Sequence, residues 1–216
     1  MTQIGASDRL PVIGTRGSPL ALAQATMTQA ALAAHHGVAA DAIPVSVIRT
    51  TGDAVTDRAL SEAGGKGLFT KEIDEAQLGG TVDVAVHSAK DLPTDLPAGL
   101  IIAGYLPRED VRDALISCHP GGWAGLPQGA RIGSASLRRR AMASRLRPDL
   151  VTDLLRGNVG TRLAKIEAGE FDATFLALAG LKRLGLADKV SAILPVEDFL
   201  PAVGQGAIAL VARADD

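Results

Sequence analysis

The sequence predicts an α/β protein made of two similar domains that face each other, each a mainly parallel sheet with flanking helices. Short apolar, β-branched runs alternate with longer Ala- and Leu-rich stretches, a pattern typical of parallel sheets. Hydrophobic residues make up 47% of the 216 residues and aromatic residues only 3%, so small aliphatic side chains must build the cores. A strand, a Gly-Ser loop and a helix with a nearby arginine occur at 13–21 and again at 132–140, about one domain further on.

The first half of the chain carries clear local signals. Pro19 stands at the first position of an Ala- and Leu-rich helix, and the alternation of residues 43–49 is typical of a strand. Residues 51–67 are rich in Gly and Asp and are expected to form a loop. We expect strands at 10–13, 43–49, 82–86 and 100–106, and helices at 19–35 and 69–78.

A second unit begins after residue 106 and repeats the alternation. Its short apolar runs predict strands, and the stretches between them have the spacing of short helices. We expect strands at 113–117, 130–132, 150–155, 173–177 and 207–211, and helices at 137–146, 161–168 and 181–184.

Composition argues against several classes of protein. The net charge of −2 favours neither nucleic acid nor a membrane surface as a partner, and no apolar run reaches the roughly 18 residues that cross a bilayer. The first residues lack the features of a signal peptide, so we expect a cytoplasmic protein. Cys118 is the only cysteine and the histidines show no ligand spacing on a helix, so neither a disulfide nor a metal site is expected.

The segment 82–91 (VDVAVHSAKD) is an apolar strand that ends in His87, Ser88, Lys90 and Asp91. Ligands of open α/β sheets bind at the carboxyl ends of strands. Lys90 can anchor an anion there, and Asp91 can bind N–H groups, stabilise a developing cation or shuttle a proton. The alternative is an ordinary strand cap before a turn.

Two arginines begin the helix expected at 137–146, after a loop whose Ser134 and Ser136 can cap it. Positive charge in a first turn opposes the helix dipole, so Arg138 and Arg139 are unfavourable there unless an anion neutralises them. The alternative is a solvated basic surface.

A second pair of arginines surrounds the next strand–helix junction. Arg156 follows a strand end, Gly157 permits close approach of a ligand, and Thr161 can cap a helix whose first turn contains Arg162. Guanidinium groups match carboxylates in bidentate geometry. The arginines together with Lys90 therefore predict a ligand that carries several carboxylates or phosphates.

Seven segments occur in one order and cover nearly the whole chain: 15–24 (TRGSPLALAQ), 64–72 (GGKGLFTKE), 85–93 (AVHSAKDLP), 136–139 (SLRR), 147–150 (RPDL), 155–163 (LRGNVGTRL) and 200–206 (LPAVGQG). Together they resemble the porphobilinogen deaminase (hydroxymethylbilane synthase) family of tetrapyrrole biosynthesis, the route to haem and porphyrins. The resemblance implies a fold like type II periplasmic binding proteins, with a cleft between domain 1 (1–105 plus 203–216) and domain 2 (106–202). It also implies a monomer.

The implied reaction joins four porphobilinogen units head to tail, each losing ammonia, on a dipyrromethane cofactor. Each unit carries an acetate and a propionate, which would account for the arginines. The resemblance gives Asp91 the catalytic role: it would hydrogen-bond pyrrole N–H groups of the cofactor and stabilise the azafulvene-like cation left by ammonia. Cofactor carboxylates would be held by Ser88, Lys90, Ser134, Ser136, Arg138, Arg139 and Arg162. The substrate site would be lined by Arg16, Ser18, Gln24, Arg156 and Gln205, with Lys66 and Phe69 in the active-site loop and its flank.

Two departures from the family stand out. Glu62 occupies a loop position that is basic in many relatives, and the chain stops at Asp216. Relatives continue into a third domain whose cysteine binds the cofactor through a thioether, a context that Cys118 does not match. We therefore expect a structural Cys118, no cofactor-attachment domain, and a chain that is inactive alone. The alternative is a non-catalytic two-domain module that binds a polycarboxylate or pyrrole.

Overall fold

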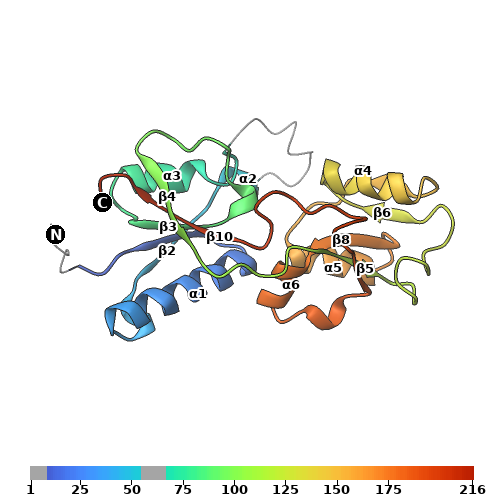
Figure 1. Ribbon diagram of the computed structural model, residues 1–216, viewed down its shortest axis with the longest axis horizontal. Helices are drawn as coiled ribbons and strands as arrows, with labels where there is room; N and C mark the ends of the chain where they lie inside the picture. Colours follow the sequence, from blue (N-terminus) through green and yellow to red (C-terminus); the bar gives the residue numbers. More distant parts are fainter. Residues whose placement is uncertain (1–8, 55–66) are drawn as a thin grey trace.

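The computed structural model describes residues 9–54 and 67–216, which form two lobes lying side by side (Figure 1). Each lobe is built on a five-stranded sheet with helices on its faces. The first lobe contains β1 (Ile13–Arg16), α1 (Pro19–His36), β2 (Val45–Ile48), α2 (Thr51–Ala54), α3 (Lys71–Leu78), β3 (Val84–Ser88), β4 (Leu100–Tyr105) and β10 (Ile208–Arg213). The second contains β5 (Asp113–Ser117), β6 (Arg131–Gly133), α4 (Leu137–Leu146), β7 (Val151–Asp153), α5 (Val159–Glu167), β8 (Ala173–Ala177), α6 (Leu178–Arg183) and β9 (Ala192–Ile193).

The two sheets have the same topology, which confirms the predicted pair of similar α/β domains. Their strand orders are β2-β1-β3-β10-β4 and β7-β6-β8-β5-β9. In each, only the fourth strand runs against the others, so the sheets are mainly parallel in direction. The repeated strand and Gly-Ser loop now have a structural meaning, since β1 and β6 occupy the same position in their sheets.

Aliphatic side chains fill both faces of each sheet. In the first lobe, Val86 and Ile208 pack with α1, whereas Ala85 and Val211 pack with Ile73 of α3. The second lobe repeats this arrangement with larger cores, one of them built around Phe175 and Phe199. Among the described helices, none is both long and apolar enough to cross a membrane.

Helix starts follow the capping chemistry of the sequence with two corrections. Ser18 caps α1 ahead of Pro19, as the sequence predicts. The expected loop is wrong at its beginning, because Thr51–Ala54 form the short helix α2. Thr161 is not a cap: α5 starts earlier, and Asn158 accepts the Thr161 backbone N–H at 2.9 Å. Most of the loop expected at 51–67 lies outside the described residues, Glu62 and Lys66 included.

The chain passes between the lobes twice, through residues 106–112 and 194–207, and the two connections are bonded together. Arg108 donates to the Gln205 carbonyl at 3.1 Å, joining one connection to the other. Helix α6 holds both, because Lys182 pairs with Glu109 at 2.8 Å and Arg183 donates to the Gly206 carbonyl at 2.6 Å. These contacts fix the position of one lobe relative to the other.

Gly206→Ala should destabilise the protein by more than about 1 kcal/mol, because its backbone is left-handed (φ 87°) and a Cβ would run into the carbonyl oxygen of Glu109. Gly37→Ala is the matched control: it shares the left-handed backbone (φ 67°) but a Cβ there meets nothing within 4 Å. Urea unfolding of both variants gives the loss of stability caused by the contact with Glu109 in the first connection. Equal losses of stability in the two variants would contradict this contact.

Candidate functional site

A pocket opens in the first lobe where β1 and β3 end and α1 begins. Its walls come from both strands, from the start of α1 and from the turn before α3. The residues lining it are Arg16, Ser18, Leu20, Ala21, Gln24, Phe69, Val86, His87, Ser88 and Asp91. The pocket therefore lies at the carboxyl edge of the parallel strands, where ligands of α/β sheets bind.

Polar side chains on the pocket wall hold one another in place. Gln24 is buried on α1 and donates from Nε2 to Ser88 Oγ at 2.9 Å, which joins the helix to the end of β3. Across the pocket, the Arg16 guanidinium lies 4.2 Å from the centre of the Phe69 ring. A cation over an aromatic face is attracted to it, so Phe69 directs the guanidinium along the wall.

His87 is a pocket residue to which the sequence assigned no role. It is 4% exposed, and its Nε2 has no hydrogen-bond partner among the described residues. Desolvation, and then the charge of Arg16, lower the His87 pKa from 6.5 to about 4. The imidazole is therefore neutral at physiological pH and adds no charge to the pocket.

We expect this buried imidazole to make the fold less stable in mild acid. The unfolded chain, whose histidine titrates near pH 6.5, takes up the proton first, so stability falls as the pH drops from 6.5 towards about 4. Between pH 7 and pH 5 the loss is about 2 kcal/mol. Urea unfolding at both pH values should show this extra loss in the wild type but not in His87→Gln. The exposed control His36→Gln should behave as the wild type, and equal pH dependence in all three would contradict the assignment.

Lys90 and Asp91 lie just past β3, in a turn of 3₁₀ helix spanning Ala89–Asp91. Lys90 is exposed, yet desolvation is the largest influence on the pKa of its amino group and lowers it. Charges of the second lobe also act on Lys90: Arg139 and Arg162 lower its pKa, while Asp113 raises it. The end of β3 therefore meets the second lobe.

Arg162 of the second lobe interacts electrostatically with Asp91. It lies in the first turn of α5, half-buried, and donates from Nε to the Gly157 carbonyl at 2.9 Å. Desolvation, and then the charges of Arg139 and Arg156, lower its pKa to about 10, whereas Asp91 raises it. These cations repel one another because positive charge is in excess around Arg162. A polycarboxylate ligand would supply the missing negative charge.

The anion that neutralises the start of α4 belongs to the protein itself. Asp113 is fully buried at the start of β5 and accepts hydrogen bonds from Arg138 and Arg139, both at 2.7 Å. Gln205 is a third donor to Asp113, at 3.1 Å, and Arg138 also donates to the Leu200 carbonyl. Burial alone would raise the Asp113 pKa, but Arg139 and then Arg138 bring it below its usual range. Asp113 thus orients the arginine pair and anchors the return connection.

The serines before α4 serve its backbone. Ser136 is the N-cap and accepts the Arg139 N–H at 3.4 Å, while Ser134, 3% exposed, accepts the Ser136 N–H at 3.2 Å. These bonds hold the loop that presents the two arginines.

The structure brings the residues expected from the sequence into two neighbouring groups. Arg16, Ser18, Gln24, Phe69, Ser88 and Asp91 line the pocket, and the charges of Arg139 and Arg162 reach Lys90 across the lobe boundary. Asp113 binds Arg138 and Gln205, and the loop before α4 is held by Ser134 and Ser136. The charge of Arg156 lowers the pKa of Arg162, and Lys66 lies outside the described residues. Sequence reasoning missed Asp113 and gave no role to His87.

Comparisons with known proteins point in one direction. Residues 12–216 match the family model described as porphobilinogen deaminase, dipyromethane cofactor binding domain. Porphobilinogen deaminase of Nitrobacter winogradskyi is 61% identical over 210 residues, which cover 97% of this chain and 66% of that protein. The Nitrobacter hamburgensis protein of the same name is 58% identical over 216 residues, covering 100% of this chain and 68% of that one. The chain thus spans about two thirds of the length of these relatives.

Solved structures support the fold. A periplasmic substrate-binding protein of an ABC transporter from Coxiella burnetii superposes with a TM-score of 0.55 at 14% identity, covering 96% of this chain and 86% of that one. The two lobes therefore have the architecture of periplasmic binding proteins, as the sequence predicts.

Proposed function

Because the chain belongs to the porphobilinogen deaminase family, we propose that its two lobes bind the dipyrromethane cofactor and porphobilinogen for hydroxymethylbilane synthesis. In that reaction porphobilinogen units are joined with loss of ammonia, on the route to porphyrins. The observation that carries the proposal is the position of Asp91. It is a carboxylate on the wall of a pocket, next to Lys90 and within the electrostatic reach of Arg162 from the other lobe.

The cation-rich region between the lobes fits a ligand such as dipyrromethane, whose two rings each carry an acetate and a propionate. Arg139 and Arg162 lower the pKa of Lys90, and Arg139 also lowers that of Arg162, so bound carboxylates would relieve this repulsion. These three residues would hold the carboxylates, with Arg138, Ser88, Ser134 and Ser136 completing the binding site. When bound, dipyrromethane supplies the primer on which the product chain grows.

The pocket of the first lobe fits the incoming monopyrrole. Arg16, directed by the Phe69 ring, would pair with a carboxylate of porphobilinogen. Ser18 and Gln24 offer hydrogen bonds on the same wall, and Arg156, Gln205 and Lys66 complete the proposed substrate set. Apolar contacts from Leu20 and Val86 would cover the ring.

Asp91 is suited to the charge that appears during deamination. When the bond between the aminomethyl carbon and ammonia breaks, the pyrrole nitrogen donates electron density and the ring system becomes cationic. A carboxylate that accepts the pyrrole N–H lowers the energy of this cation more than that of the neutral substrate. Asp91 in turn attracts the cations around it, because its charge raises the pKa of Lys90 and of Arg162.

Finer features of the proposal concern organisation and location. We place domain 1 at 1–105 plus 203–216 and domain 2 at 106–202, which the two bonded connections between the lobes support. We also propose a cytoplasmic monomer, because biosynthesis of this kind uses small soluble substrates.

Calorimetric titration of the chain with a dipyrromethane that bears two acetates and two propionates tests the binding half. We expect Lys90→Met to weaken binding about tenfold or more, while Lys189→Met, an exposed lysine of the second lobe, leaves it unchanged. Absence of binding, or equal affinity of the two variants, would count against the site. Ammonia release from porphobilinogen tests the chemistry, and binding without release would favour a non-catalytic module.

A further inference from the structure

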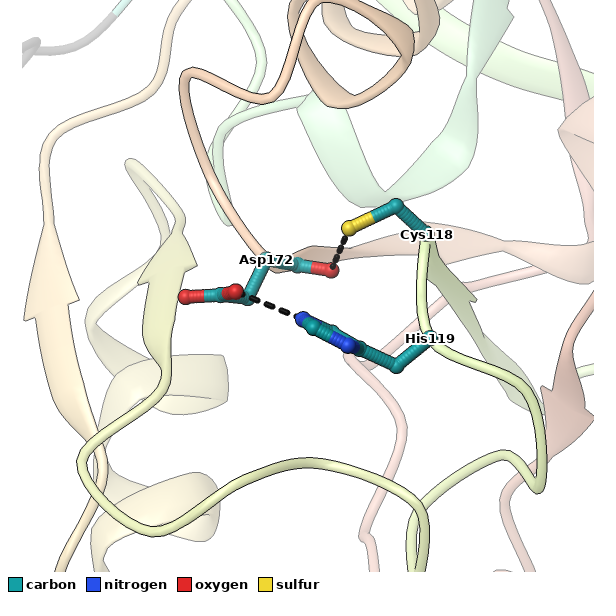
Figure 2. Close-up of side chains that lie close together, drawn as sticks. All are labelled: Cys118, His119 and Asp172. Atoms are coloured by element: carbon teal, nitrogen blue, oxygen red, sulfur yellow. Dashed lines mark hydrogen bonds and ion pairs between the residues drawn. The ribbon is translucent and has the colours of Figure 1, made fainter.

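A second group of reactive side chains lies at the opposite end of the second sheet from Asp113. Cys118 and His119 follow the end of β5, and Asp172 precedes β8, the strand that pairs with β5 (Figure 2). Cys118 lies five positions after Asp113, just past the end of β5, a distance of about 17 Å at the usual rise per residue. The group is therefore separate from the proposed cofactor site.

Three different donor atoms converge here. A ring nitrogen of His119, Nε2, lies 2.6 Å from Asp172 Oδ1, and Cys118 Sγ lies 3.5 Å from the Asp172 carbonyl oxygen. The thiol, imidazole and carboxylate donor atoms all lie within 4.8 Å of one another, and no ion is present. Figure 2 shows the carboxylate and the imidazole directed at each other, with the sulfur beside them.

Backbone contacts hold these side chains in position. Asp172 accepts the Arg131 backbone N–H through Oδ2 at 2.7 Å, which orients its other oxygen towards His119. The Asp172 carbonyl accepts the Cys118 N–H at 3.2 Å and the Ser117 hydroxyl at 3.1 Å. Hydrogen bonds to the ligand residues, such as these, orient the ligands in metal sites.

We propose that Cys118, His119 and Asp172 bind a zinc ion through the thiolate sulfur, the imidazole Nε2 and the carboxylate Oδ1, with water in the fourth position. Zinc takes sulfur, nitrogen and oxygen ligands at about 2.0–2.3 Å in a tetrahedron, so its ligand atoms lie about 3–4 Å apart. The three donors reach that arrangement by shifts of about 1 Å, which side-chain rotations supply. All three are partly or fully exposed, so an ion can enter from solvent.

Binding requires defined proton movements. The thiol releases its proton to solvent as the sulfur–zinc bond forms, and the imidazole carries its remaining proton on the other ring nitrogen. The hydrogen bond between His119 Nε2 and Asp172 Oδ1 is then replaced by two bonds to the zinc ion, one from each atom. The ion ties the end of β5 to the start of β8, so it stabilises the folded second lobe.

No metal site was predicted from the sequence, because two of these ligands are adjacent and the third is more than fifty residues away. Ligand motifs on helices reveal themselves by regular spacing. Here antiparallel pairing of β5 with β8 brings the ligands together, and only the register of the strands reveals it.

Cobalt provides the test, because Co²⁺ takes zinc sites and reports its ligands by absorption. The reduced 216-residue chain should bind one Co²⁺ with a near-ultraviolet thiolate-to-metal band, which one equivalent of Zn²⁺ removes. The band can arise only from Cys118, the sole cysteine. Its absence in the wild type would overturn the proposal.

Variants separate a metal site from simple hydrogen bonding. Cys118→Ser should abolish the band, and His119→Gln should weaken Co²⁺ binding by at least about tenfold. His36→Gln, an exposed histidine on the other lobe, should match the wild type. Zn²⁺ should raise the Tm of the wild type and of His36→Gln, but not of His119→Gln. Equal cobalt affinity in the two histidine variants, or a zinc-dependent Tm in both, would show that the cluster only joins the strands by hydrogen bonds.

Discussion

In a full-length context that includes the cofactor-attachment domain of the relatives, Asp91→Asn should lower the rate of ammonia release from porphobilinogen by at least about two orders of magnitude with little effect on folding. The substitution keeps the size and one acceptor oxygen of the side chain but removes the negative charge that faces the developing cation. Removing one preorganised electrostatic contact of this kind costs about 10²–10³ in kcat. Stability should change little, because Asp91 is exposed at the pocket edge. The measurement is ammonia release under saturating porphobilinogen, together with urea unfolding.

Asp95→Asn is the matched control for this variant. Asp95 is an exposed carboxylate four positions further along the chain and does not line the pocket. It should retain wild-type turnover. If Asp91→Asn loses turnover only through a raised KM, the carboxylate binds substrate without stabilising the cation, and the assigned role is wrong.

The first lobe's part of the site could be predicted because its signals are local. An apolar strand that ends in polar residues places them at the sheet edge, so Ser88 and Asp91 follow from the sequence of β3 alone. Likewise, Pro19 after Ser18 marks the start of α1 and brings Gln24 towards the strand. In both cases the residues that determine the geometry lie within a few positions of the functional group.

Asp113 could not be found in this way. It reads as the first residue of a strand, and its partners lie 25, 26 and 92 residues away in Arg138, Arg139 and Gln205. The sequence did predict that an anion must neutralise the arginines at the start of α4, but it could not show that the protein supplies one. The role of His87 was not predicted for a related reason, because its burial depends on the strands and helices that pack around it.

Element boundaries shifted where capping competes with strand or loop propensity. The sequence predicted Thr161 as the cap of α5, but Asn158, three positions earlier, caps the helix, which begins at Val159. Such choices depend on how the helix packs, here through Leu163 and Ile166 on the sheet.

Asp113→Asn should destabilise the protein by about 3–5 kcal/mol, the usual cost of removing one partner from a buried ion pair. Two guanidinium groups would lose their common counter-charge at a position with no exposure to solvent. The control is Asp153→Asn, whose carboxylate pairs with Arg131 at the surface and should contribute less than about 1 kcal/mol. Urea unfolding at pH 7 compares the two variants.

The pH dependence of this loss distinguishes charge from packing. The two arginines hold the pKa of Asp113 in the folded protein below its ordinary value of 3.8. Its stabilisation is therefore complete above about pH 5 and disappears as the pH falls through the folded-state pKa. The difference between the wild type and Asp113→Asn should be constant from pH 7 to pH 5 and shrink below pH 4. A difference that persists in acid would mean that the amide disturbs packing around β5, and that the arginine pair does not depend on the charge of Asp113.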